Sequence, residues 1–304
     1  MQIGGRWVAA IGANRQDLAA QPLGGTVTRA GPNGPSGWDA GAYDHLSDPQ
    51  YAWGQRVIGR LELRGDETVL DAGCGTGRLT ALLLERLPHG RVIAVDRSPA
   101  MLAAARSNLA AAGRRVTYLC ADLQTIVLGR PVDAIFSTAT FHWILDHPRL
   151  FWALAGVLIP GGRLEAQCGG GPNLARLRAR VQGLTKQEPF ATFFQGWQEP
   201  WRFSWPAEAA EQLERAGFGE VATSLEPAPT SFDSAGAFGR FLRQVVLWPH
   251  LERLPERLRE PFMGSLVAQA AGDDPPFVVD YWRLNLRGRR RMAGPRRRAA
   301  DEVK

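Results

Sequence analysis

Three closely spaced glycines separate a predicted buried strand from a predicted helix, and this segment constrains the fold more than any other. The apolar run 67–72 is followed by Gly73, Gly75 and Gly77 at a spacing of two residues. Leucines at helical spacing then occur within residues 77–87. Glycine is needed where a backbone takes positive φ or passes tightly against a ligand, and the new helix offers free N–H groups there. The segment therefore predicts a strand–loop–helix unit that binds a ligand.

Apolar runs and helical patterns alternate from Trp38 to about residue 168. Further strands are predicted at residues 91–96, 115–121, 132–137 and 162–167, and helices at residues 99–112 and 147–158. This alternation predicts βαβ units, and hence an α/β fold whose parallel sheet is covered by helices on both faces. The carboxyl ends of parallel strands meet at one edge of such a sheet, where ligands bind. Residues 160–162 are expected to form the turn between the last helix and strand.

Two neighbouring strands also end in an acidic residue at this edge. Asp96 ends one strand, 19 residues after Gly77, and Asp122 follows the next strand. An acid at the position of Asp96 accepts hydrogen bonds from the hydroxyls of a ribose in dinucleotide folds. Asp122 is suited to accept the amino group of an adenine, and a turn cap is its alternative role.

The glycine spacing and Asp71 together define the kind of ligand. The dinucleotide fingerprint G-x-G-x-x-G is incomplete, because Arg78 stands where its third glycine would be. Asp71 would repel a pyrophosphate but suits a ligand with a positive centre, and a strand-end cap is its alternative role. These features disfavour an NAD-dependent oxidoreductase. Together with Asp96 and Asp122 they predict an adenosine-type ligand with a positive centre, and S-adenosylmethionine (SAM) has that form.

The segments VLDAGCGTG, AVDRSPAML and CADL resemble the class I SAM-dependent methyltransferases over residues 38–168. The resemblance implies a Rossmann-like, seven-stranded, mostly parallel sheet whose last strand is antiparallel. Strands six and seven would come from residues 219–225 and 277–286. It also implies SAM as the cofactor, held by Asp71, Gly73, Cys74, Gly75, Gly77, Asp96, Arg97, Met101, Asp122, Leu123 and Thr138.

The same resemblance implies separate roles for these residues. The glycine loop would hold the methionine end of SAM, and Asp96 its ribose. Asp122 and the backbone of Leu123 would reach the adenine, on which Met101 would pack. Cys74 is expected as a small residue that fits the loop rather than as a catalytic thiol.

Three further segments are similar to the group of trans-aconitate 2-methyltransferase and malonyl-carrier-protein methyltransferase: WDAGAYDHLSDPQ, FHWILDHPRLFWALAGVLIPGG and DYWRLNLRGRR. Those enzymes convert a free carboxylate to its methyl ester. This chain departs from the group at Thr138, where a small amide residue is usual, and at His142, where glutamine is usual. The expected function is therefore a SAM-dependent methyltransferase of a small molecule, favouring O-methylation of a carboxylate. The alternatives are O-, N- or C-methylation of a natural-product scaffold, and a protein that holds SAM or its product without turnover.

The acceptor side of the site is less defined by the sequence. His142 is a candidate general base or substrate contact, with a polar pocket wall as the alternative. A carboxylate needs no base at pH 7, whereas a phenol does. Trp143 is expected to line the pocket, and Arg176 is a candidate clamp for an anionic substrate. Trp38 and Tyr43 are expected over the SAM site, where an aromatic face favours a sulfonium, or alternatively in the packing of the first helix.

One methyltransferase domain is predicted at residues 37–287, with its SAM-binding core at 38–168. A substrate cap is expected from insertions at about 169–218 and 231–272. Helices outside the core are predicted at residues 173–185, 207–216, 235–248 and 255–271. Residues 1–36 are expected to form a flexible leader, and residues 288–304 a disordered basic tail.

Charge and composition disfavour several classes of protein. Residues 283–304 carry a net charge of +7 against +6 for the whole chain, so the high pI comes from the tail. The chain has 34 arginines and two lysines without a clustered basic face, so no nucleic-acid partner is predicted. No apolar stretch approaches the ~18 residues that a membrane-spanning helix needs, and no signal peptide is expected. The three cysteines lack metal-ligand spacing, so we expect no metal site and a cytoplasmic location. The sequence leaves the oligomeric state open.

Overall fold

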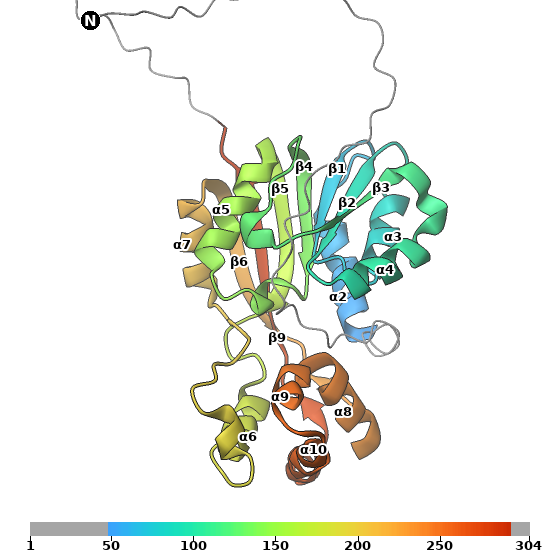
Figure 1. Cartoon of the computed structure of the whole chain (residues 1–304). Helices are drawn as coiled ribbons and strands as arrows, with labels where there is room; N and C mark the ends of the chain where they lie inside the picture. The colour runs from blue at the N-terminus through green and yellow to red at the C-terminus, as the bar shows by residue number, and fades with distance from the viewer. Residues whose placement is uncertain (1–47, 293–304) are drawn as a thin grey trace, which may run out of the picture. The chain divides into compact units, whose positions relative to one another are not determined.

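The structure, a computed structural model, describes residues 48–292 (Figure 1). Its main sheet has the strand order β3-β2-β1-β4-β5-β9-β6. These strands are β1 (Thr68–Ala72), β2 (Arg91–Asp96), β3 (Val116–Cys120), β4 (Val132–Thr138), β5 (Leu158–Gly169), β6 (Phe218–Pro227) and β9 (Trp282–Arg290). Strands β1 to β5 pair in parallel, whereas β9 is antiparallel to both β5 and β6. The predicted seven-stranded, mostly parallel sheet with an antiparallel last strand is confirmed.

Helices cover both faces of this sheet. The helices are α2 (Asp48–Arg60), α3 (Arg78–Glu85), α4 (Pro99–Asn108), α5 (His147–Val157), α6 (Ala175–Leu184), α7 (Pro206–Arg215), α8 (Ala235–Phe241), α9 (Trp248–Arg253) and α10 (Glu256–Ala271). One core cluster joins the apolar sides of α2, α3 and α4 to the sheet, and a second joins those of α5 and α7. The sheet is thereby buried on both faces, as its apolar strands require.

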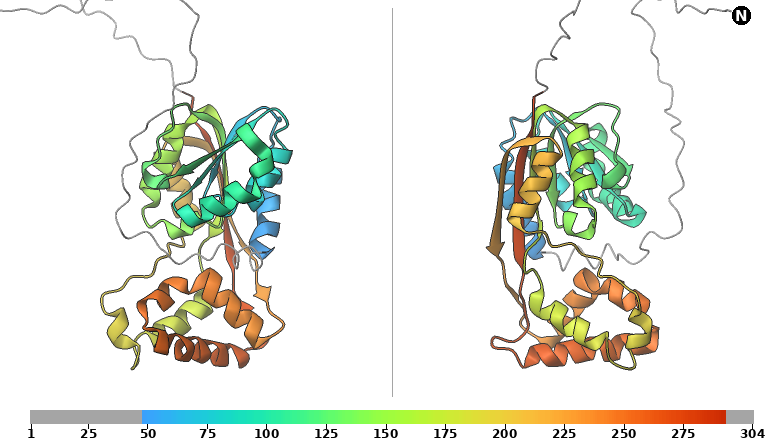
Figure 2. Two further views of the ribbon diagram at one scale, coloured as in Figure 1. Left: turned by 45° about the vertical axis from the view of Figure 1, so that its right-hand side comes forward. Right: turned by 90° about the vertical axis from the view of Figure 1, so that its left-hand side faces the viewer.

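A third apolar cluster forms a cap on the site. It joins buried side chains of α6, α8, α9 and α10 with aromatic residues of the segment between α6 and α7. The cap also holds a two-stranded sheet of β7 (Thr230–Ser231) and β8 (Val278–Val279). Figure 2 shows these helices grouped beyond the end of the main sheet, on the side where β5 ends and α6 begins.

The predicted cap boundaries need correction. The expected insertion 169–218 includes α7, but α7 packs on α5 and β6 and its Leu213 belongs to the core of the sheet. The expected tail from residue 288 also begins too early, because β9 continues to Arg290. In this part of β9, Arg289 makes a 3.1 Å ion pair with Glu220 of the neighbouring strand β6. Helix packing decides the first boundary, and strand pairing within an arginine-rich segment decides the second.

Several element boundaries also differ from the periodicity. Within the helix expected at 235–248, α8 ends at Phe241 and a π-helical turn (Leu242–Val246) follows. A separate helix, α9, begins at Trp248, because Pro249 has no N–H with which to continue the preceding helix. Helix α4 ends at Asn108 rather than residue 112. The expected turn at 160–162 lies inside β5 as a register shift, where Gly161 has a φ of +77°.

Candidate functional site

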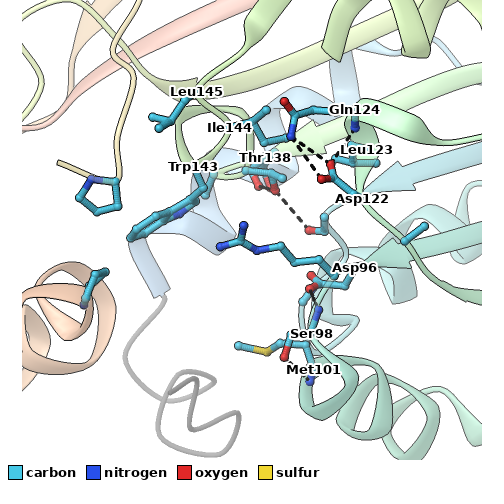
Figure 3. A pocket seen from close by; sticks show the side chains of 18 of the residues that line it. Asp96, Ser98, Met101, Asp122, Leu123, Gln124, Thr138, Trp143, Ile144 and Leu145 are labelled. Carbon is cyan, nitrogen blue, oxygen red and sulfur yellow. Dashed lines mark hydrogen bonds between the residues drawn. The ribbon is translucent and has the colours of Figure 1, made fainter. Parts of the chain in front are cut away.

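A cavity of about 500 Å³ opens at the carboxyl ends of β1, β2 and β4 (Figure 3). Figure 3 shows Asp96 and Asp122 on one side of it, across from Trp143. The cap closes the same cavity through Pro200, Trp248 and Pro249. The structure brings together these predicted site residues along its wall: Gly73, Gly75, Asp96, Arg97, Met101, Asp122, Leu123, Thr138 and Trp143.

The glycine loop leaves room for a ligand at close range. Gly73 has a φ of +88°, and a Cβ there would lie 2.1 Å from Oγ1 of Thr140. Gly75 has a φ of +54°, and a Cβ there would meet nothing within 4 Å. Because Gly75 lines the cavity, a side chain at this position would project into space that a ligand needs.

Asp96 is held by two backbone groups at the tip of β2. Gly75 N–H donates to its Oδ2 at 3.0 Å, and Ser98 N–H donates to its Oδ1 at 2.9 Å. Burial raises the pKa of Asp96, and the hydrogen bonds from Ser98 and Gly75 oppose this rise. A carboxylate has about four lone-pair sites, so both oxygens can still accept hydrogen bonds from a ribose. The predicted ribose role fits this geometry and stays a prediction.

Asp122 also has a structural role beside its predicted ligand role. Its Oδ1 accepts a hydrogen bond from Gln124 N–H at 2.8 Å, which caps the short helix Leu123–Thr125. The alternative role as a turn cap is therefore real, and one carboxylate can serve both purposes. Met101 is 4% exposed and lines the same cavity, as the predicted packing on an adenine requires.

A smaller cavity of about 60 Å³ adjoins the glycine loop and contains Asp71, Cys74 and Gln50 in its wall. Burial raises the pKa of Asp71 to about 7, although Thr80 Oγ1 donates a hydrogen bond to its Oδ2 at 2.6 Å. The Oε1 atom of Gln50 is buried without a hydrogen-bond partner among the described residues. A carboxylate and a free carbonyl oxygen are suitable acceptors for an α-ammonium group, so this cavity fits the amino-acid end of SAM.

Cys74 lies in an environment that disfavours its thiolate. Burial raises the pKa of its thiol, and the charges of Asp71 and Asp96 raise it further. Because only the thiolate is reactive, the thiol stays inert at neutral pH. The expected role as a small residue within the loop fits this chemistry.

His142 and Trp143 lie in the short helix Phe141–Trp143, directly after β4. His142 lines a third cavity, of about 30 Å³, between the sheet and the cap. Its Nδ1 accepts a hydrogen bond from Gly169 N–H at 3.3 Å, which places the proton of the neutral ring on Nε2. Burial lowers the pKa of His142 well below its usual value, and the positive charges of Arg283 and His147 contribute. The ring is therefore neutral at pH 7 and presents an N–H donor.

Comparison with known proteins identifies the family. A family model described as "Methyltransferase domain" matches residues 69–162. The trans-aconitate 2-methyltransferase of Azoarcus sp. strain BH72 is 32% identical over 249 residues, which cover 79% of this chain and 91% of that protein. The trans-aconitate 2-methyltransferase of Methylobacterium nodulans is 30% identical over 273 residues, which cover 83% and 98%. The chain belongs to the class I SAM-dependent methyltransferases.

A solved structure supports the fold of this methyltransferase. Phosphoethanolamine N-methyltransferase 2 of Haemonchus contortus, in complex with SAM, superimposes with a TM-score of 0.53 at 17% identity. The match covers 84% of this chain and 57% of that chain. SAM is the cofactor of this methyltransferase, and the residues present fit it, because the open space at Gly75 and the acceptor atoms around Asp71 suit its amino-acid end.

Some predicted residues of the methyltransferase do not reach the cavities. Arg176 lies outside all three, because it pairs with Asp273 at 3.7 Å and donates to the carbonyl of Val278. The structure does not bring Arg176 together with the other predicted site residues, and its role as a substrate clamp stays a prediction. Trp38 and Tyr43 lie outside the residues that the structure describes, as does the expected leader.

Other residues at the site were missed from the sequence. Ala139 lines all three cavities and has a φ of +53°, which is rare for alanine. Arg283, Asn173 and Trp248 reach the site from distant segments. Only the cap serine of α4, Ser98, carries a local signal, and no motif distinguishes the others from core residues.

Proposed function

We propose that this methyltransferase acts on a carboxylate of a small molecule and forms a methyl ester. The observation that carries this proposal is the state of His142. Its Nδ1 already accepts a hydrogen bond, and burial holds its pKa well below the usual value. The residue therefore suits hydrogen-bond donation to an acceptor oxygen better than removal of a proton.

An acceptor that is already ionised fits such a site. A carboxylic acid has a pKa near 4 and a phenol one near 10, so only the carboxylate is a ready nucleophile at pH 7. When bound, SAM supplies a methyl group to the acceptor oxygen, and the sulfonium leaves as a neutral thioether. The chain then contributes by alignment and by excluding water through the cap, and alignment alone is worth about 7–11 kcal/mol in well-ordered cases.

The relatives support the same acceptor class. Both relatives compared above bear the name trans-aconitate 2-methyltransferase, so trans-aconitate is the first acceptor to test. For cofactor binding we propose Asp96 on the ribose, Asp122 and Leu123 at the adenine, and Asp71 with the glycine loop at the methionine end. We also propose the cytoplasm as the location, on the cysteine pattern of the sequence.

The test uses methyl-labelled SAM with trans-aconitate and a panel of other di- and tricarboxylic acids. The products are then treated with mild alkali, which hydrolyses esters. We expect the label to be released as volatile methanol. Label that resists alkali would contradict the proposal, because it indicates an ether, amine or carbon acceptor. Absence of transfer despite tight binding of S-adenosylhomocysteine (SAH) would favour the non-catalytic alternative.

A further inference from the structure

A second histidine lies buried beside the turn that carries His142. His147 begins α5, and only 1% of its surface is exposed. Its Nε2 lies 3.0 Å from the carbonyl oxygen of Phe141, which can only accept, so the Nε2–H donates this hydrogen bond. Burial lowers the pKa of His147, and the ring is neutral at pH 7. Its Nδ1 therefore accepts a hydrogen bond from the hydroxyl of Ser204, whose Oγ lies 3.0 Å away.

His147 fixes the peptide group that precedes His142. The carbonyl of Phe141 belongs to the peptide bond between Phe141 and His142, and His147 holds this carbonyl. The next peptide bond is held as well, because Arg202 N–H donates to the carbonyl of His142 at 2.9 Å. The ring of His142 is held at Nδ1 by Gly169 N–H. Both peptide groups beside the Cα of His142 and one ring nitrogen are therefore fixed, so the direction of its Nε2–H is set.

The second hydrogen bond of His147 joins this turn to the segment between α6 and α7. Ser204 lies in that segment, next to Phe203 and near Trp201. Both aromatic residues line the 30 Å³ cavity together with His142. The ring centroid of Phe203 lies 5.9 Å from that of His142. The bond between His147 and Ser204 therefore keeps His142 in place beside the aromatic wall of the same cavity.

We propose that His147 is a positioning residue for methyl transfer, which acts by aligning the Nε2–H of His142 with the acceptor. The inference rests on the proposed carboxylate methylation and deepens it, because it names the group that sets the direction of the donor. His147 is not among the residues that line the three cavities, so it reaches the acceptor only through His142.

A displaced His142 would impair transfer without impairing the cofactor site. A misplacement of about 1 Å caused far from the reacting atoms can lower a rate about 100-fold. Asp96 and the glycine loop lie on other segments, and both ring nitrogens of His147 are already engaged elsewhere. Packing alone does not require a histidine here, because the ring lies against Phe151 at a centroid distance of 5.6 Å and an apolar side chain could fill the same place. A loss confined to the acceptor therefore distinguishes positioning from a general loss of structure.

The test uses two amide side chains that each keep one hydrogen bond of the imidazole. The amide nitrogen of glutamine lies as many bonds from Cβ as Nε2 does, and that of asparagine as many as Nδ1 does. In His147→Gln the donor to Phe141 is retained, and kcat/KM for trans-aconitate should stay within about threefold of the unchanged protein. In His147→Asn this donor is lost, and kcat/KM should fall at least tenfold. The affinity for SAH, measured by calorimetric titration, should stay within about threefold in both variants.

A double-mutant cycle shows whether His147 acts through His142. In a His142→Ala background the aligned donor is absent, so His147→Asn should lower kcat/KM by less than a further threefold. Ser204→Ala tests the same contact in a chain that keeps the buried histidine, and should show a weaker loss, of about three- to tenfold. His89→Asn, at an exposed histidine outside the cavities, is the matched control and should leave kcat/KM and SAH affinity within twofold. Thermal unfolding checks that each variant is folded at the assay temperature.

NMR of the ring nitrogens gives a readout without turnover. The chain has five histidines, so their ring signals can be assigned by substituting one histidine at a time. In the SAH complex at pH 7, we expect His142 as a single Nε2–H tautomer in the unchanged protein and in His147→Gln. In His147→Asn the signals of His142 should broaden or shift toward a mixture of tautomers, because its ring is no longer held in one place.

The outcomes separate this inference from the proposed function. Equal kcat/KM in the two His147 variants would overturn the positioning role, and so would an undiminished loss in the His142→Ala background. A parallel loss of SAH affinity would overturn it as well, because it indicates a general loss of structure. Label that resists alkali would refute the proposed function itself. The ring signals then still decide the inference, since an unchanged Nε2–H tautomer of His142 in His147→Asn would overturn it.

Discussion

The cofactor side and the acceptor side of the site are built in different ways. On the cofactor side, Asp71, Asp96 and Asp122 each lie at or just beyond the end of a parallel strand. On the acceptor side, His142 follows β4 and Arg283 lies in the antiparallel β9, while cap residues complete the wall. The first side depends on short local segments, and the second depends on tertiary packing.

Buried ionisable side chains near the sheet differ from one in the cap in their hydrogen bonds. Near the sheet, Asp71 receives a hydrogen bond from Thr80, and buried Glu67 receives bonds from Arg163 and two backbone N–H groups. In the cap, His250 is fully buried and neither ring nitrogen has a hydrogen-bond partner among the described residues. The carboxylates of Asp71 and Glu67 are thus held by hydrogen bonds, whereas the ring of His250 is held by aromatic packing.

The largest effect is expected from Asp96→Ala on the cofactor side. The variant should weaken SAH binding at least 100-fold, because a buried carboxylate that holds the ribose hydroxyls is removed. Calorimetric titration with SAH measures this, and thermal unfolding checks that the loop of Gly75 and Ser98 keeps its fold. Asp66→Ala, at an exposed aspartate outside the cavities, is the matched control. Near-unchanged affinity for SAH in Asp96→Ala would show that Asp96 does not hold the cofactor.

The sequence could predict the cofactor side because its signals are local. The glycine loop and the acids at the strand ends occur within short segments, so spacing alone placed Asp71, Asp96 and Asp122 at one edge. The acceptor side has no such signal. Arg283 falls within the predicted strand 277–286 but belongs to no motif, and it enters the site because β9 pairs between β5 and β6. Arg176 had the expected chemistry, but its ion pair with Asp273 holds it outside the cavities.

The affinity for SAH should be about tenfold higher at pH 8 than at pH 6. The pKa of Asp71 is about 7 in the ligand-free chain, and the ammonium group of SAH favours the ionised carboxylate. Affinity therefore stays high above pH 7 and falls as the pH drops below it. In Asp71→Asn the affinity at pH 8 should be lower and this tenfold change should disappear. An equal pH dependence in both proteins would assign the titration to another group.

Asp71→Asn should also stabilise the ligand-free protein at pH 8. The pKa of Asp71 rises from 3.8 to about 7 on folding, so stability falls as the pH rises through this range. The difference corresponds to at most about 4 kcal/mol above pH 7. Urea unfolding at pH 8 and pH 4 measures it, and the gain should vanish at pH 4. If Asp71→Asn gains stability and loses affinity for SAH, the buried carboxylate of Asp71 serves binding at a cost in stability.

A smaller effect on the cap is expected from His250→Phe. The ring centroid of His250 lies 4.5 Å from that of Trp197 and 5.2 Å from that of Trp201. A phenylalanine ring at this position would keep the aromatic packing. It removes two unpartnered polar atoms and should stabilise the protein by about 1–2 kcal/mol at pH 7. Burial lowers the pKa of His250 to about 3, so the unfolded chain takes up its proton first as the pH falls below 6.5. The gain should therefore grow from pH 6.5 to pH 5 in urea unfolding, and a loss of stability would indicate a polar partner.

The smallest effect is expected from His142→Gln, and it separates a hydrogen-bond donor from a general base. The glutamine amide can replace the Nε2–H as a donor, but it cannot take up a proton. With a carboxylate acceptor, kcat/KM should fall less than threefold and its pH profile should keep its shape. A general base would instead be worth about 10²–10⁴-fold. The lowered pKa of His142 and its hydrogen bond from Gly169 favour the loss of less than threefold. A loss of 100-fold or more would therefore show that the acceptor side performs proton transfer, and would make an unionised acceptor the better assignment.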